Sequence, residues 1–157
     1  MYRKILVPYD NSEHAQHALL AAIDLAEGVD DVLVTVLNVT DLMDFDDTAF
    51  ETAARMAGIP RMSDDAAQQA RKSYYEEHER GIRKSIDEVL TEVPAGVNLE
   101  IAIDSGRPQE VISSKATEEG YDCIVMGRRG LGAIRGALGS VSYAVLRETD
   151  LPVLIVK

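Results

Sequence analysis

A glycine-rich stretch near the C-terminus has the residue types that bind phosphate. Residues 125–145 read "VMGRRGLGAIRGALGSVSYAV" and contain five glycines, the last of which is followed directly by Ser140. Glycine lets backbone N–H groups approach an anion because no side chain intervenes. A helix that begins after such a loop adds the N–H groups and the positive dipole end of its N-terminus. The stretch therefore predicts either a phosphate-binding loop or a flexible connection in which Ser140 is only a helix N-cap.

Two standard phosphate motifs do not match this stretch. The Gly-Lys-[Ser/Thr] end of a Walker A loop is absent from the sequence. "GRRGLG" has the wrong spacing for the dinucleotide fingerprint, and it follows the fourth apolar run rather than the first. Any phosphate site here must therefore be of another type.

Apolar runs and turn residues predict alternating strands and helices. The run Ile5–Val7 is typical of a strand buried on both faces, and Asn11 and Ser12 offer N-caps for a helix that Gly28 closes. Right-handed crossovers between such strands give an α/β fold, a parallel sheet with helices on both faces. Strands are expected over residues 4–10, 31–39, 98–104, 122–127 and 151–157, and helices over 15–26, 70–93, 107–120 and 140–148.

The middle of the chain divides into an acidic half and a helical half. Residues 41–65 are rich in aspartate and are broken at Gly58-Ile59-Pro60, so we expect a short helix, a break and a mobile insertion. The insertion is either a lid over a site or a loosely packed excursion. In the long helix that follows, His78 falls on the line of apolar residues and is expected to be a packed histidine rather than a ligand.

Composition excludes several classes of partner. The chain has 27 acids against 16 bases, a formal net charge of -11, which disfavours nucleic acid and anionic membranes as partners.

No apolar run is long enough for a transmembrane helix, the N-terminus lacks a signal-peptide pattern, and Cys123 is the single cysteine, so we expect a cytoplasmic protein. Arginine outnumbers lysine, 11 to 5, and an acidic, lysine-poor surface is also typical of proteins from salt-rich cytoplasm.

Three strand ends are expected to meet at one edge of the sheet. In parallel sheets, ligands bind beyond the carboxyl ends of the strands, where the strand order reverses. Here these ends carry "PYDNS", "NVTD" and the glycine-rich stretch. The carboxylate of Asp10 suits hydroxyls better than phosphates, whereas the glycines present N–H donors that suit phosphates.

The order of these motifs resembles the universal stress protein family over nearly the whole chain. The resemblance runs from "KILVPYDNSEHAQHAL" and "VLNVTD" through "GRPQEVISSKATEEGYDCIVMGRRG" to "GSVSYAVLRETDLPVLIVK". It implies one domain over residues 1–157 with an open five-stranded parallel sheet, Rossmann-like and adenine nucleotide alpha hydrolase-like, in strand order 3-2-1-4-5. The ATP-binding branch carries Gly-x2-Gly-x9-Gly-[Ser/Thr]. Gly127, Gly130 and Gly139-Ser140 match its residue types, although only eight residues, 131–138, separate the last two glycines.

The resemblance also implies a set of ATP contacts. Asp10 would contact the ribose, Val39 the adenine, and magnesium or manganese could bridge the phosphates without an all-protein metal site. Pro8 and Tyr9 would lie beside the nucleoside, and Met126 and Gly127 would form the floor. The phosphates would be wrapped by Gly130, Gly139, Ser140 and Val141, with Arg129 adding charge and Ser142 assisting.

Three functions are compatible with these residues. The first is a nucleotide-binding stress or regulatory module, which resembles the family in forming a homodimer through its last strand, Pro152–Lys157, and acts on protein partners that the sequence does not identify. The second is a slow ATPase or phosphotransferase. No catalytic residue is assigned, because His14 and His17 are expected on the surface of the first helix, so binding is favoured over turnover. The third is a dimeric interaction module with an empty pocket.

Overall fold

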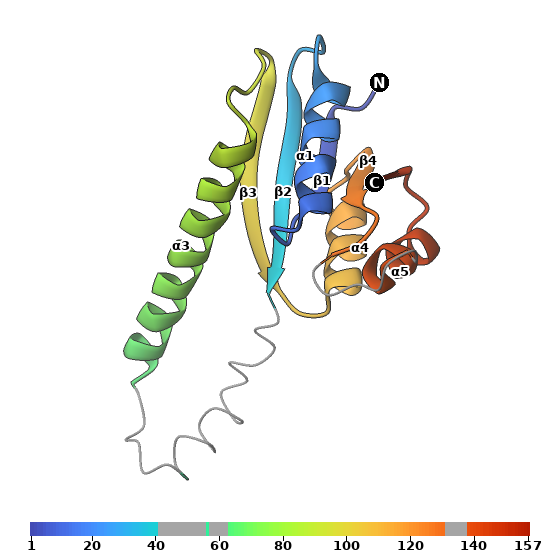
Figure 1. Ribbon diagram of the computed structural model, residues 1–157. Helices are drawn as coiled ribbons and strands as arrows, with labels where there is room; N and C mark the ends of the chain where they lie inside the picture. The colour runs from blue at the N-terminus through green and yellow to red at the C-terminus, as the bar shows by residue number, and fades with distance from the viewer. Residues whose placement is uncertain (41–55, 57–62, 131–137) are drawn as a thin grey trace.

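A parallel sheet with helices on both faces organises the protein (Figure 1). The computed structural model describes residues 1–40, 56, 63–130 and 138–157. The strands lie in the order β3-β2-β1-β4-β5 and every pairing is parallel, which confirms the predicted topology. The strands are β1 (Lys4–Pro8), β2 (Val32–Thr40), β3 (Val97–Ser105), β4 (Cys123–Gly127) and β5 (Val153–Val156). The helices are α1 (Glu13–Ala26), α3 (Asp64–Val89), α4 (Pro108–Glu118) and α5 (Ser140–Glu148).

The sheet separates two apolar cores because successive strand residues point to opposite faces. Ile5 and Val7 pack with α1 and α3 on one face, whereas Leu6 packs with α4 and α5 on the other. The apolar run of β1 is therefore continuous because both of its faces are covered. No helix among the described residues is both long enough and apolar enough to cross a membrane.

Local sequence signals set the ends of α1 and α4. Ser12 caps α1, since its Oγ accepts a hydrogen bond from Ala15 N–H at 3.2 Å. The helix ends at Ala26, and Gly28 follows with a φ of 74°, a conformation that favours glycine. Pro108 begins α4, where its missing N–H would have had no partner within the helix.

Helix α3 begins earlier and ends earlier than the predicted 70–93. Ser63 caps it, so residues 64 and 65 of the predicted insertion belong to its first turn. Ile82 and Ile86 are buried, but residues near its start are exposed, because the first half extends past the carboxyl ends of β2 and β3 (Figure 1). Apart from Met56 and residues 63–65, the insertion and its expected mobility lie outside the described residues.

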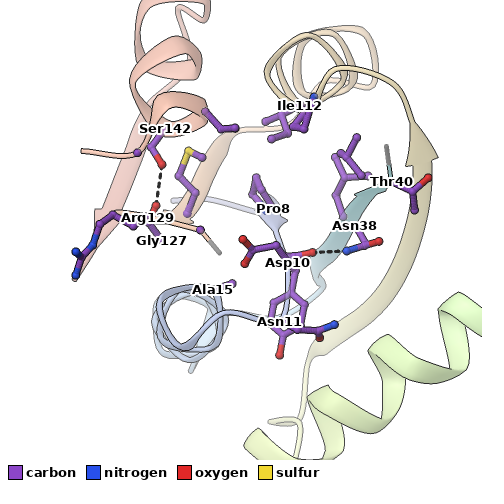
Figure 2. Close-up of a pocket in the computed structure, with 18 of the residues that line it drawn as sticks. Pro8, Asp10, Asn11, Ala15, Asn38, Thr40, Ile112, Gly127, Arg129 and Ser142 are labelled. Carbon is purple, nitrogen blue, oxygen red and sulfur yellow. Dashed lines mark hydrogen bonds between the residues drawn. The ribbon is translucent and has the colours of Figure 1, made fainter. Parts of the chain in front are cut away.

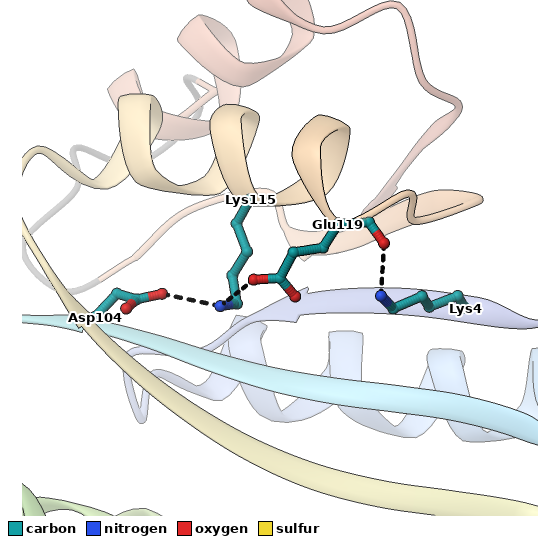
Figure 3. A network of polar contacts seen from close by, with 4 residues as sticks. All are labelled: Lys4, Asp104, Lys115 and Glu119. Atoms are coloured by element: carbon teal, nitrogen blue, oxygen red, sulfur yellow. Dashed lines mark hydrogen bonds and ion pairs between the residues drawn. The ribbon is translucent and has the colours of Figure 1, made fainter.

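A chain of polar contacts fastens α4 to the sheet (Figure 3). Lys115 Nζ lies 3.1 Å from Asp104 Oδ2 on β3 and 2.7 Å from Glu119 Oε1, and Lys4 Nζ donates to Glu119 O at 2.6 Å. Burial lowers the pKa of Lys115, but the hydrogen bonds to Glu119 and Asp104 raise it above its ordinary value overall. The contacts thus join α4 to both β3 and the start of β1.

Candidate functional site

A cavity of about 680 Å³ lies where β1, β2 and β4 end (Figure 2). This volume is in the usual range for small-molecule sites. Helix α3 borders the cavity on one side and α4 on another, and the start of α5 closes a third. All twelve residues predicted to contact ATP line it: Pro8, Tyr9, Asp10, Val39, Met126, Gly127, Arg129, Gly130, Gly139, Ser140, Val141 and Ser142.

The backbone of β2 is open toward this cavity at Val39. The rungs between β1 and β2 run from Leu33 N–H donating to Arg3 O up to Tyr9 N–H donating to Leu37 O at 2.8 Å. In a parallel ladder the next rung would be Val39 N–H to Tyr9 O. That bond does not form among the described residues. Val39 therefore presents one donor and one acceptor beyond the end of β1.

Tyr9 is buried, and its hydroxyl pairs with a serine of α3. Its side chain is 2 % exposed, and its hydroxyl lies 2.9 Å from Ser85 Oγ on α3. Burial raises the pKa of Tyr9, and the hydrogen bonds to Ser85 and Gln16 counteract this only in part. Its carbonyl accepts a hydrogen bond from Asn38 Nδ2 at 2.7 Å (Figure 2).

Close contacts require the glycine that ends β4 and the one three residues later. A Cβ on Gly127 would lie 2.7 Å from the backbone carbonyl of His14, so α1 approaches β4 only because this side chain is missing. A Cβ on Gly130 would overlap Asp10 Oδ2. Gly127 thus serves helix packing, and Gly130 leaves room for the Asp10 carboxylate.

The two ends of the glycine-rich loop are joined through the backbone. Gly139 N–H donates to Arg128 O at 2.9 Å, so this N–H is engaged within the protein. This bond holds the residue before α5 against the residue after β4. Residues 131–137, which include Gly132 and Gly136, lie outside the described residues.

The N-terminus of α5 faces the cavity without a side-chain cap. Gly139 is the N-cap residue and Ser140 is the first helical residue, so the alternative in which Ser140 is a plain N-cap is wrong. Ser142 is 3 % exposed and its hydroxyl donates to Gly127 O at 2.9 Å, which fastens α5 to the end of β4. The N–H groups of the first turn, Ser140 to Ser142, have no partner within the helix.

His14 is less exposed than the sequence suggested. It is half-buried, and its Nε2 lies 3.2 Å from Arg129 Nη2. Since a guanidinium only donates, the His14 nitrogen accepts this hydrogen bond. His17 is exposed as expected, with its Nδ1 3.2 Å from Lys157 O. Among the described residues, no three His, Cys, Asp or Glu side chains are grouped to hold a metal ion.

Sequence reasoning missed several residues that line the cavity. Tyr74 and His78 on α3 stack with ring centroids 5.0 Å apart, so His78 is both packed, as expected, and part of the cavity wall. Asn38 and Thr40 are 7 % and 6 % exposed, and neither Asn38 Oδ1 nor Thr40 Oγ1 has a hydrogen-bond partner among the described residues. In the sequence, Asn38 and Thr40 alternate at the end of an apolar strand, and this pattern could have indicated polar residues beside a site.

The whole chain, residues 1–157, matches the family model described as the universal stress protein family. The protein belongs to this family. A universal stress protein of Thermus aquaticus is 34% identical over 158 residues, which cover 100% of both chains. The solved structure of a universal stress protein of Methanocaldococcus jannaschii superposes with a TM-score of 0.69 at 28% identity, covering 100% of this chain and 96% of that one.

Two more distant structures share the fold and hold nucleotides. One is a universal stress protein in complex with cAMP, with a TM-score of 0.61, 20% identity and coverage of 99% of this chain and 97% of that one. The other is the universal stress protein of Archaeoglobus fulgidus in complex with dAMP, with a TM-score of 0.58, 20% identity and coverage of 99% and 98%.

Proposed function

We propose that this universal stress protein binds an adenine nucleotide, ATP, and acts as a homodimeric regulatory module. One arrangement carries the proposal. The open backbone edge of β2 at Val39 and the uncapped N-terminus of α5 lie on the same cavity, with Asp10 also on its wall. A base, a sugar and a chain of phosphates need these three kinds of group in one site.

The edge at Val39 suits adenine. Its N–H can donate to the ring nitrogen N1, and its C=O can accept from the 6-amino group. Guanine and hypoxanthine carry a hydrogen on N1 and an oxygen at C6, so both contacts would be mismatched. Met126 and Ile112 add an apolar surface against which the ring can pack.

Asp10 and α5 suit the rest of the nucleotide. The carboxylate of Asp10 can accept from ribose hydroxyls, and its Oδ1 is oriented by a hydrogen bond from Ser12 N–H at 3.1 Å. The N–H groups of Ser140 and Val141, together with the positive end of the helix dipole, can bind phosphate oxygens. Arg129 adds a positive charge in a protein whose net charge is -11.

Magnesium or manganese would be held by the phosphate oxygens and would neutralise their charge. The hydroxyl of Ser140, which is exposed at the start of α5, suits the same phosphates. These residues favour nucleotide binding over fast hydrolysis, because Asp10 is assigned to the ribose and not to the role of a general base. The complexes of two family members with cAMP and dAMP support a nucleotide in a site of this fold.

Mass spectrometry of the ligand released from the purified, denatured protein tests the proposal. Co-purified ATP is the expected result. ADP or AMP, with phosphate release from added ATP, would instead indicate a slow ATPase. Absence of nucleotide, together with no thermal shift on adding ATP, would contradict the proposal and favour an interaction module with an empty pocket.

We further propose that the homodimer forms along β5. This strand lies at the edge of the sheet, and apolar side chains are exposed on it and on α5: Leu154 at 43%, Tyr143 at 55% and Leu146 at 42%. An apolar edge strand favours pairing with a second copy. Leu154→Glu should therefore give a monomer at micromolar concentration, whereas Leu25→Glu, at a leucine 39% exposed on α1, should remain dimeric. A monomeric unsubstituted protein would refute this interface.

A further inference from the structure

The β1–β2 ladder ends one rung early, and a side chain occupies the place of the missing rung. Tyr9 N–H donates to Leu37 O, so the ladder is intact at this point. Tyr9 O should next accept from Val39 N–H. It accepts instead from Asn38 Nδ2 at 2.7 Å (Figure 2).

The orientation of the Asn38 amide is fixed by this contact. A carbonyl oxygen can only accept, so the atom that faces Tyr9 O must be the nitrogen of the amide. Asn38 is 7 % exposed, and its Oδ1 has no hydrogen-bond partner among the described residues. A buried amide with an unsatisfied oxygen is unfavourable. Its presence in an apolar strand therefore indicates that the hydrogen bond from Nδ2 to Tyr9 O has a role.

We propose that Asn38 is a positioning residue that sets the selectivity of the site for adenine. Its amide replaces the last backbone rung, holds Tyr9 O, and so leaves Val39 N–H open to the ligand. Without the amide, Val39 N–H rotates toward Tyr9 O and completes the ladder. The part of this inference that concerns selectivity rests on the proposed function, whereas the replaced rung does not.

The selectivity follows from the donor at Val39. ATP and ITP differ only in the base, where ITP has an oxygen at C6 and a hydrogen on N1. An open Val39 N–H faces an acceptor in ATP and a donor in ITP. We expect the unsubstituted protein to bind ATP at least about tenfold more tightly than ITP, because a buried mismatch leaves polar groups unpaired.

Hydrogen exchange followed by NMR on the nucleotide-free protein tests the replaced rung directly. In the unsubstituted protein, the Val39 amide should exchange at least about tenfold faster than the Leu37 amide, which lies within the paired strands. In Asn38→Leu and in Asn38→Asp, which keeps the shape but not the donor, Val39 exchange should slow toward that of Leu37. Equal protection of Val39 and Leu37 in the unsubstituted protein would overturn the inference whether or not the variants fold.

Calorimetric titration with ATP and with ITP tests the selectivity. Asn38→Leu should weaken ATP binding about tenfold and leave ITP binding nearly unchanged, so that the preference for ATP is lost. Thr35→Val is the matched control, since Thr35 is buried in the same strand, 3 % exposed, but does not line the cavity. It should keep the preference.

The two proposals can fail separately. An unchanged ATP-to-ITP ratio in Asn38→Leu would overturn the role of Asn38 in selectivity. If the unsubstituted protein binds neither nucleotide, the proposed function fails, while slower Val39 exchange in the variants would still support the replaced rung.

Discussion

At the residue scale, the glycines at the end of β4 and just after it are restricted by what a side chain would touch. Gly127 faces the backbone of His14, and Gly130 faces Asp10 Oδ2. Neither glycine is needed for an unusual φ, since neither is among the residues with positive φ. Their absent side chains therefore allow close approach, of α1 to the sheet in one case and of a carboxylate to the loop in the other.

The thiol of Cys123 is buried and is therefore expected to react slowly. It is 3 % exposed in β4, and burial raises the pKa of its thiol from 9.0 to about 11. Because the thiolate is the reactive form, Cys123 should react with a disulfide reagent at pH 8 far more slowly in the folded protein than in urea. The stability that the buried neutral thiol contributes is fully present below pH 9. It should be lost as pH rises toward 11, because only the unfolded chain readily forms the thiolate. Fast labelling of folded protein at pH 8 would contradict this burial.

At the scale of elements, α3 consists of two halves with different roles. Its second half packs on the sheet through Ile82 and Ile86, which are 1 % and 3 % exposed. Its first half extends beyond the carboxyl ends of β2 and β3 (Figure 1). Tyr74, near the end of this half, and His78, just after it, border the cavity. The helix therefore links the sheet core to the candidate site.

Substitutions in α3 should separate these halves. Ile86→Ala leaves a cavity in the core and should lower the free energy of unfolding by about 2–5 kcal/mol. Gln69→Ala changes an exposed position in the first half and should stay within about 0.5 kcal/mol of the original. Urea denaturation measures both. Equal effects of the two substitutions would show that the second half does not carry the packing.

The sheet could be predicted from the sequence because its signals are local. Apolar runs, Ser12 and Pro108 each act within a few residues, and right-handed crossovers then restrict the topology. The hydrogen bond from Asn38 to the Tyr9 carbonyl could not be predicted, because Tyr9 follows a different strand, β1, 29 residues earlier in the chain. His78 shows the same limit: helical periodicity correctly indicated packing but not that α3 passes the end of the sheet. Contacts between distant segments thus account for most of what was missed.

At the scale of the whole molecule, charge opposes compactness. A net charge of -11 on 157 residues produces repulsion that salt screens. We predict that raising potassium chloride from about 0.1 M to about 2 M increases the urea midpoint of unfolding. Chloride is the appropriate anion, because sulfate stabilises proteins through exclusion regardless of their charge. A midpoint independent of potassium chloride would contradict the hypothesis that the acidic surface suits the protein to high salt.

Asp10, Gly130 and the N-terminus of α5 line one cavity, which we propose binds ATP. Calorimetric titration of ATP into nucleotide-free Gly130→Ala tests it most directly, because the added Cβ would displace the Asp10 carboxylate. Gly81→Ala is the matched control, since a Cβ at this position in α3 would meet nothing within 4 Å. We predict that Gly130→Ala weakens ATP binding at least about tenfold and that Gly81→Ala leaves it unchanged. Equal ATP affinity in Gly130→Ala and the unsubstituted protein would contradict an ATP site at Asp10 and Gly130.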